Sequence, residues 1–350
     1  MSKKLYFVFA ILIIAAMVTP ACSTKVDCSK ADTFCVGLVT DVGKVDDKSF
    51  NQSAWEALQQ AKKDLKATVK YIETTDSKDY AKNIATFADE KYDVIVTVGF
   101  NLGEATLAAA GTYPNVKFIG IDQFQSWPLD TDTSNDVANV VGLNFPEDIA
   151  GFLVGALAAQ MTTSKKIGAV CGTDAVAPVW RFGEGYKAGA AYIDPAVEVT
   201  VVYHSDVGFD KTFTDPEWGK TTASSMIDKG ADVIFGAGGK TGNGALQGAA
   251  EKKVYAIGVD TDQYYTVPEA KAWLISSAMK LIVPGTFDLI KMAKDGTMPN
   301  GNFTGQAGYA PFHDLDSKVP AAVKTKMQEI DKMLKDGTLK TNVSPAKPAE

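Results

Sequence analysis

The sequence predicts an α/β protein made of two similar lobes, each built on a largely parallel sheet. Three observations support this fold class. Short β-branched runs such as CVGLVT (35–40), DVIVTVG (93–99) and DVIFGAG (232–238) alternate with helical patterns. The two halves of the chain resemble each other. The chain has 350 residues, of which 46% are hydrophobic, and this length suits two domains better than one.

The N-terminus is typical of an export signal. Lys3 and Lys4 precede an apolar run over Leu5–Val18, which at about 14 residues is short for a membrane span. Small residues then lead into Cys22. We therefore expect a lipoprotein signal peptide over 1–21, lipidation of Cys22 and anchoring on the extracytoplasmic side of the cell membrane. Ordinary cleavage near Ala21, which would release a secreted protein, is the alternative.

The remaining cysteines precede or lie within strands. Residues 22–33 form a predicted linker, and Cys28 and Cys35 lie seven residues apart at its end. Outside the cytoplasm they are candidates for a disulfide, although two free thiols are the alternative. Cys171 lies inside the apolar run KIGAVCG (166–172) and is expected to be a buried thiol.

The charge of the chain limits its partners. The formal net charge is −7, and removal of residues 1–21 takes two lysines and no acid, which leaves −9. An acidic chain without a basic block argues against nucleic acid or an anionic membrane surface as a partner. We expect a monomer.

The predicted elements follow one another in the order strand, helix, strand in both halves. In the first half, the strand at 35–40 precedes a helix over 50–65, and strands at 93–99 and VKFIGID (116–122) follow. The second half has strands at 166–172, EVTVVY (198–203), 232–238 and VYAIGVD (254–260), and a short strand LISSAMK at 274–280. Strands separated by helices predict parallel sheets with right-handed crossovers.

Several positions in the two halves match, three of them at a separation of 138 or 139 residues and one at 132. They are Asp93 and Asp232 (139 residues apart), Gly99 and Gly238 (139), Asp122 and Asp260 (138), and Phe50 and Phe182 (132). Ligands of open α/β sheets bind at the carboxyl ends of the strands, and sites between domains are common. Two facing lobes therefore predict one cleft lined by both sets of strand ends.

Two aromatic residues are candidates for the walls of this cleft. Phe50 and Phe182 each lie near the start of a predicted helix, where they can hold a flat ring between two aromatic faces. The alternative is that each ring belongs to the core, because both fall on apolar helical stripes.

Polar candidates also lie at strand ends. Asp41, Asp122 and Asp260 each end an apolar strand, and an ionised carboxylate accepts hydrogen bonds from ligand hydroxyl or amino groups. Helix caps or solvated loop residues are the alternative for all three. Asn51 can both donate and accept. Lys280 ends the strand at 274–280, and a surface lysine is the alternative there.

Signals of catalysis are scarce in the sequence. The Gly-rich stretch GAGGKTGNG (236–244) is not a phosphate-binding P-loop, because Ile234 stands where that motif requires glycine. Backbone N–H groups near Gly238 remain candidates for a ligand oxygen. The two histidines, His204 and His313, have no cysteine or carboxylate at metal-ligand spacing. We expect no enzyme activity, no cofactor and no metal.

Longer motifs indicate a family. The segments DVGKVDDKSFNQSAWEAL (41–58), GIDQFQ (120–125), VGLNFPEDIAGFLVGALAA (141–159), GAGGKTGNG and GVDTDQ (258–263) resemble the basic membrane protein family. These bacterial lipoproteins are the substrate-binding components of ABC importers and include purine nucleoside receptors. The resemblance covers nearly the whole mature chain, and its first motif is the most specific.

The resemblance implies a type I periplasmic-binding-protein fold, in which two Rossmann-like lobes are joined by three crossovers. Lobe one would comprise residues 34–143 and 275–298. Lobe two would comprise residues 144–274 and 299–345. An ABC permease in the membrane would be the partner.

The resemblance also implies roles for single residues. In nucleoside-binding members two phenylalanines enclose the base, and they match Phe50 and Phe182. An aspartate in the loop of the first strand matches Asp41, the asparagine that follows the first phenylalanine matches Asn51, and the base-contacting aspartate matches Asp122. The residues that hold the ribose match Asp260 and Lys280, with the glycine backbone near Gly238. Trp180 lies close to Phe182 in the sequence and is a second candidate for that wall.

Adenosine, guanosine and inosine are the expected ligands. A sugar or an amino acid on the same scaffold is the alternative within the binding class, and a free amino acid would need Arg181 or Lys280 as the partner of its carboxylate. Two different functions compete with solute delivery, namely a sensor for a membrane kinase and an exported nucleoside hydrolase. The hydrolase would need a metal-binding aspartate set, for which Asp41, Asp46 and Asp47 are the only residues near the first strand.

Overall fold

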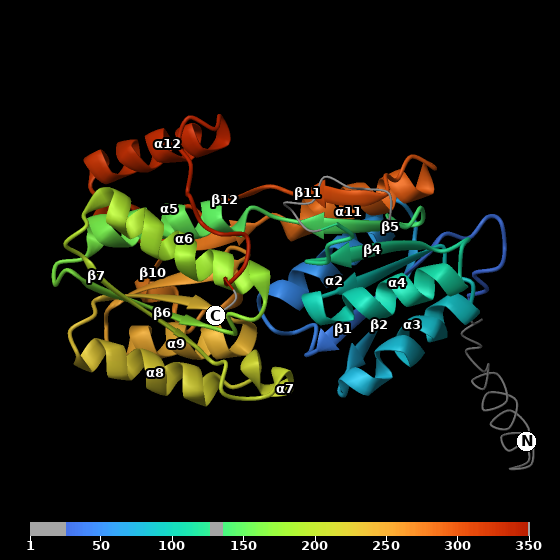
Figure 1. Ribbon diagram of the computed structural model, residues 1–350, viewed down its shortest axis with the longest axis horizontal. Helices are drawn as coiled ribbons and strands as arrows, with labels where there is room; N and C mark the ends of the chain where they lie inside the picture. The colour runs from blue at the N-terminus through green and yellow to red at the C-terminus, as the bar shows by residue number, and fades with distance from the viewer. Residues whose placement is uncertain (1–25, 127–135, 349–350) are drawn as a thin grey trace, which may run out of the picture.

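The protein contains two six-stranded sheets, one in each lobe (Figure 1). The computed structural model describes residues 26–126 and 136–348. The first sheet has the order β11-β5-β4-β3-β1-β2, and all its neighbouring strands are parallel. Its strands are β1 (Cys35–Val42), β2 (Thr68–Thr74), β3 (Val94–Val98), β4 (Lys117–Ile121), β5 (Val140–Asn144) and β11 (Gly301–Thr304).

The second sheet repeats this pattern in the order β12-β10-β9-β8-β6-β7. Its strands are parallel except for the edge pair of β10 and β12. They are β6 (Lys166–Cys171), β7 (Glu198–Tyr203), β8 (Val233–Ala237), β9 (Tyr255–Asp260), β10 (Leu274–Lys280) and β12 (Ala307–Tyr309). The predicted fold class, two α/β lobes of the type I periplasmic-binding-protein kind, is confirmed.

Helices cover both faces of the first sheet. Those on one face are α2 (Phe50–Asp64) and α11 (Ile282–Lys294), and those on the other are α3 (Tyr80–Asp89) and α4 (Gly103–Thr112). The buried face of α2 is the stripe of Ala54, Leu58 and Ala61, at the spacing of a helix with one apolar side. Asp47 caps this helix, because its carboxylate accepts from the backbone N–H groups of Asn51 and Gln52 at 2.9 and 3.1 Å.

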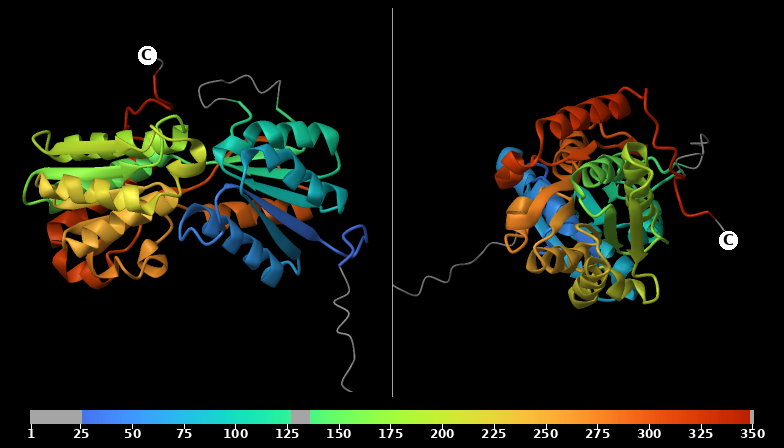
Figure 2. Two further views of the ribbon diagram at one scale, coloured as in Figure 1. Left: turned by 90° about the horizontal axis from the view of Figure 1, so that it is seen from below. Right: turned by 90° about the vertical axis from the view of Figure 1, so that its left-hand side faces the viewer.

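The second sheet is covered in the same way (Figure 2). One face carries α5 (Glu147–Met161), α6 (Ala177–Ile193) and α12 (Ala321–Lys335), and the other carries α8 (Pro216–Asp228) and α9 (Gly239–Glu251). Glycines let α5 and α6 pack closely, since a Cβ atom at Gly155 or Gly189 would collide with the backbone of the opposite helix. This packing fixes the position of Phe182, whose backbone carbonyl approaches Gly151.

Three crossovers join the lobes, but two of them fall later in the chain than predicted. The first crossover follows β5, as expected. The strand β10 was expected in lobe one, whereas it pairs with β9 and β12 in the second sheet. Residues 301–304 were expected in lobe two, whereas they form β11 beside β5 in the first sheet. The physical reason is strand pairing, because β10 is an apolar strand that finds its partner in the neighbouring β9 before the chain crosses to α11.

The N-terminal part of the described chain is held by a disulfide between Cys28 and Cys35, the pair that the sequence suggested. Cys171 is a buried free thiol, also as predicted. The predicted signal peptide and Cys22 lie outside the described residues. No helix within 26–126 or 136–348 combines the length and apolar character needed to cross a bilayer.

Candidate functional site

A cavity of about 280 Å³ lies between the two lobes at the carboxyl ends of the strands. Its volume is near the lower end of the range for sites that enclose small molecules, roughly 300–1,000 Å³. All eight residues predicted to bind a ligand line this cavity. They are Asp41, Phe50, Asn51 and Asp122 from the first lobe, and Phe182, Gly238, Asp260 and Lys280 from the second.

The internal repeat extends to backbone conformation at two of these residues. Asp122 follows β4 with a φ of 59°, and Asp260 ends β9 with a φ of 65°. Aspartate tolerates this left-handed region better than most residues, but the conformation still has a cost. In both lobes the turn places a carboxylate in the cavity instead of continuing the strand.

Lys280 ends β10 and is a buried cation in the wall of the cavity, with a side chain only 1% exposed. Its ammonium group donates to both oxygens of Asp122, at 2.7 and 2.5 Å, and lies 3.2 Å from Glu147. Burial alone lowers the pKa of Lys280, but the charges of Asp122, Glu147 and Asp260 raise it further than burial lowers it. Lys280 is therefore a charged residue that is already paired.

Glu147 lies behind the cavity wall, in contact with Lys280, and was not predicted from the sequence. It begins α5, is 1% exposed, and lies 2.6 Å from Arg181 as well as beside Lys280. Arg181 also donates to the backbone carbonyl of Phe145. The signal was present in the sequence, since Glu147 and Asp148 are the only charged residues in a 15-residue helix that is otherwise almost wholly apolar.

The Asp260 carboxylate contacts the other lobe through a neutral group. The hydroxyl of Ser49, from the loop before α2, donates to Asp260 Oδ2 at 2.7 Å. Burial raises the pKa of Asp260, and the charge of Lys280 and the Ser49 hydrogen bond offset part of that rise. Ser49 is fully buried and was also missed from the sequence.

Asp41 and Asn51 form a further polar pair. Asn51 is 5% exposed, and its amide lies beside the Asp41 carboxyl group, where it favours the ionised form and lowers the pKa. Burial raises the pKa of Asp41 to about 8, and the neighbouring carboxylate of Asp47 adds to the shift. Burial likewise raises the pKa of Asp47 to about 6, although its capping hydrogen bonds to α2 act in the opposite direction.

The two phenylalanines contribute rings from opposite lobes. Phe50 is half-buried at the first position of α2, whereas Phe182 is 3% exposed in α6. The ammonium nitrogen of Lys280 lies 4.9 Å from the centre of the Phe50 ring and 5.8 Å from that of Phe182. Phe182 thus belongs both to the core, where its ring meets Phe235, and to the cavity wall.

Trp180 is not among the residues that line the cavity. Its ring stacks on Tyr203 with centroids 6.4 Å apart. The wall near Phe182 is completed instead by Pro178 and Val179, which precede it on α6.

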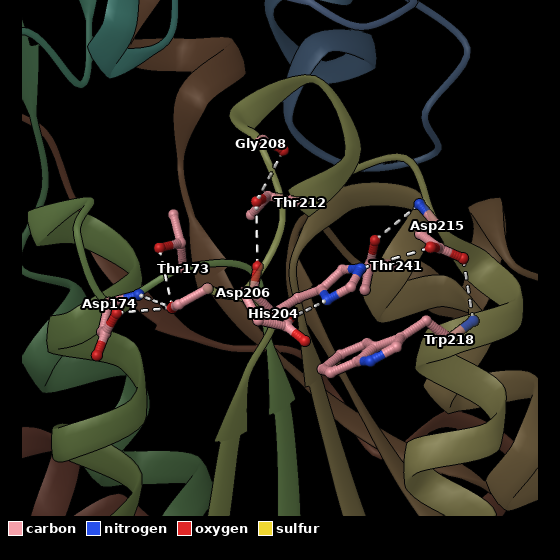
Figure 3. A network of polar contacts seen from close by, with 10 residues as sticks. Thr173, Asp174, His204, Asp206, Gly208, Thr212, Asp215, Trp218 and Thr241 are labelled. Atoms are coloured by element: carbon pink, nitrogen blue, oxygen red, sulfur yellow. Dashed lines mark hydrogen bonds and ion pairs between the residues drawn. The ribbon is translucent and has the colours of Figure 1, made fainter.

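The segment between β7 and α8 brings Phe213 and Thr214 to the cavity. Figure 3 shows the polar contacts that hold this segment. The ring nitrogens of His204 lie 3.2 Å from Asp206 and 3.4 Å from Asp215, and the ring stacks on Trp218 at a centroid distance of 3.9 Å. His204 therefore fixes the base of the loop. Among the described residues, no group of three potential metal ligands is arranged to hold an ion.

Together, the fold and the cavity define a two-lobed solute-binding protein. The chain belongs to the family described as ABC transporter substrate-binding protein PnrA-like, whose model matches residues 34–305. The resemblance to the basic membrane protein family is thereby confirmed. Members of such transport systems bind a small molecule and work with a membrane permease.

Similar proteins agree with this assignment. The chain is 32% identical to a CD4+ T-cell-stimulating antigen of Listeria monocytogenes, over 98% of this chain and all of the relative. It is 31% identical to the ABC transporter nucleoside-binding protein BmpA of Lactococcus lactis, over 75% of this chain and 76% of that one. The crystal structure of an ABC transporter solute-binding protein from Aeropyrum pernix superposes with a TM-score of 0.76, at 24% identity, over 88% of this chain and 92% of that chain.

Proposed function

We propose that the protein binds a purine nucleoside in the cavity between its lobes and delivers it to an ABC permease. The observation that carries the proposal is the pair of rings from opposite lobes, Phe50 and Phe182, on one small cavity. A planar base between two aromatic faces gains contact area and about 0.5–1.5 kcal/mol for each ring pair. The nucleoside-binding relative from Lactococcus lactis supports the choice of ligand.

The polar groups of the cavity suit a ligand rich in hydrogen-bond donors. Asp260 accepts one hydrogen bond from Ser49 and retains acceptor capacity for ribose hydroxyls. The Asn51 side-chain oxygen is buried and has no partner among the described residues. It is available to an N–H group of the base, and a buried acceptor of this kind favours a ligand that satisfies it.

A free amino acid fits the cavity less well. Its carboxylate would need a cation, and both candidates are already paired with acids, Lys280 with Asp122 and Arg181 with Glu147. A sugar remains the competing ligand, since carboxylates and rings serve sugars too.

Calorimetric titration of the full chain in detergent with nucleosides, free bases, sugars and amino acids separates these classes. We expect a purine nucleoside to bind with a Kd below about 100 μM, or about −5.5 kcal/mol. Binding of a sugar alone would reject the proposal.

The role of Asp260 has its own test. Asp260→Ala removes the acceptor of the ribose hydroxyls, and we expect nucleoside affinity to fall about 30-fold, which corresponds to about 2 kcal/mol. Asp228→Ala is the matched control, because Asp228 lies on the same lobe with its carboxylate exposed beside Lys252. Equal affinities of the two variants would contradict the ribose role.

We further propose that Cys22 carries the lipid that keeps the receptor at the extracytoplasmic face of the membrane. The support is the sequence before it, with its lysines and apolar run. Labelling of cells with a radioactive fatty acid should mark the wild type but not Cys22→Ser, which should appear in the medium or the periplasm. A labelled, membrane-bound Cys22→Ser would overturn the anchor. Loss of nucleoside uptake on deletion of the gene would support transport over a sensor for a membrane kinase.

A further inference from the structure

The part of the cavity formed by Asp41 and Asn51 differs from the rest, because it is polar but contains no ion pair. A Cβ atom at Gly43 would lie 3.1 Å from Asn51 Nδ2 and 3.7 Å from Asp41 Oδ1, so the glycine leaves room for the two side chains to meet. The Asn51 amide lies beside the Asp41 carboxyl group, and the amide oxygen has no partner among the described residues. The structure thus leaves a buried acceptor of Asn51 unused beside Asp41.

The charges around Asp41 make its protonation state sensitive to small changes. Asp47 in the loop before α2 and Asp122 at the end of β4 both disfavour a further negative charge, whereas the Asn51 amide on α2 favours it. The hydroxyl of Tyr80 on α3 is also close enough to interact with Asp41.

No cation in the described part of the chain pairs with Asp41. Lys280 is paired with Asp122 and Glu147, and Lys240 lies 3.2 Å from Asp46. Lys44 also lines the cavity, but it is exposed to solvent. Asp41 is half-buried, and a partly desolvated carboxyl group without a cation favours its neutral form, in keeping with the raised pKa of about 8.

The two forms of Asp41 offer a ligand opposite hydrogen-bonding groups. A carboxylic acid has an O–H donor, whereas a carboxylate only accepts. A 6-aminopurine presents a bare ring nitrogen, which needs a donor, beside an amino group that suits the Asn51 oxygen. A 6-oxopurine presents a ring N–H, which needs an acceptor, beside a carbonyl oxygen that gains no hydrogen bond from the Asn51 oxygen. Asn51 therefore favours the 6-aminopurine in both states of Asp41, and only the preference at the ring nitrogen changes with the proton.

We propose that Asp41 selects between purine bases through its own proton, so that protonation favours adenosine and ionisation shifts the relative affinity toward inosine. This inference rests on the proposed nucleoside function and adds to it a rule for base selection. It predicts that adenosine binding takes up a proton where Asp41 is ionised in the free protein, and that inosine binding releases one where Asp41 is protonated.

The test is calorimetric titration of the full chain with adenosine and with inosine between pH 6.5 and 8.5. If each base needs one form of Asp41, the ratio of adenosine affinity to inosine affinity falls up to about tenfold for each pH unit, because the competent fraction of the site changes in opposite directions. Titration at pH 8.5 in two buffers of different ionisation enthalpy measures the proton uptake with adenosine directly.

Asp41→Asn removes the titration, and its ratio of affinities should not change with pH. Asp228→Asn on the surface is the control and should behave as the wild type does. Nucleoside binding with a flat ratio in the wild type, or a slope that persists in Asp41→Asn, overturns the selection rule and leaves the nucleoside function intact. Failure of both nucleosides to bind the wild type overturns both.

Discussion

Asp122 and Asp260 occupy equivalent positions in the two lobes, yet their partners differ in kind. Both end the fourth parallel strand of their half, both have left-handed φ angles of 59° and 65°, and both line the same cavity. The carboxylate of each also contacts a residue of the other lobe. Asp122 pairs with the ammonium group of Lys280, whereas Asp260 accepts from the hydroxyl of Ser49. The repeated fold has thus kept the position of the carboxylate and changed its chemistry.

We interpret this difference as a structural role for Asp122 and a binding role for Asp260. Asp122 is engaged on both oxygens by a buried cation, so little of its acceptor capacity is left for a ligand. Asp260 receives a neutral donor on one oxygen and can accept more. A charge pair buried across the lobes fixes their junction, whereas a carboxylate held by a hydroxyl remains open to exchange partners with a ligand.

The contact at Ser49 belongs to a short segment of lobe one that lies on lobe two. The backbone carbonyl of Lys48 accepts from Gln263 at 3.1 Å and from Thr266 at 2.7 Å, at α10 (Gln263–Thr266). The carbonyl of Asp47 accepts from Asn243 at 2.8 Å. This segment runs directly into Phe50, so the wall of the cavity and the contact between the lobes are continuous in the chain.

We expect the largest loss of stability when the ion pair between Lys280 and Asp122 is broken. Lys280→Met leaves Asp122 buried without a cation and removes one partner of Glu147. Loss of one member of a buried ion pair typically costs about 3–5 kcal/mol, and we expect a loss of that size in the free energy of unfolding by urea. The structural role assigned to Asp122 predicts this loss in the absence of any ligand.

The double variant Lys280→Met/Asp122→Asn provides the control for this prediction. It removes the uncompensated charge together with the cation, while Arg181 still neutralises Glu147. The double variant should therefore be more stable than Lys280→Met alone. If the two are equally destabilised, the cost lies in lost packing around Lys280, and the charge pair does not fix the junction.

Much of this arrangement is predictable from the sequence, because residues at matching places in the internal repeat lie at equivalent places in the two lobes. The constant separation of Asp122 from Asp260 and of Gly99 from Gly238 predicts facing strand ends. The structure places all eight predicted residues on one cavity. The position of β10 was not predictable in this way, because an isolated apolar strand does not show which of two sheets it joins.

The partners across the cleft also escaped the sequence reading. Periodicity shows which side of an element is buried, but it does not show which side chain of the other lobe lies opposite. Ser49 looks like an ordinary residue before a helix, and Glu147 looks like a helix-start acid, a position that favours carboxylates in any protein. Their roles follow only when α2, α5 and β9 are brought together in space.

We expect a smaller loss of stability when the hydrogen bond between Ser49 and Asp260 is removed. Ser49→Ala removes the hydroxyl that donates at 2.7 Å to Asp260 and leaves one carboxylate oxygen without that donor. A hydrogen bond to a charged group contributes about 1.5–3 kcal/mol, and the contacts of Asp47 and Lys48 with lobe two remain, so we expect a loss near the lower figure in the same urea experiment. Ser276→Ala is the matched control, since Ser276 is also buried but donates within lobe two to the neutral carbonyl of Ala310, also at 2.7 Å. Because that acceptor is uncharged, its loss should be smaller, about 1 kcal/mol. A Ser49→Ala loss as large as that of Lys280→Met would mean that both aspartates hold the lobes together equally, and the division between a structural and a binding carboxylate would fail.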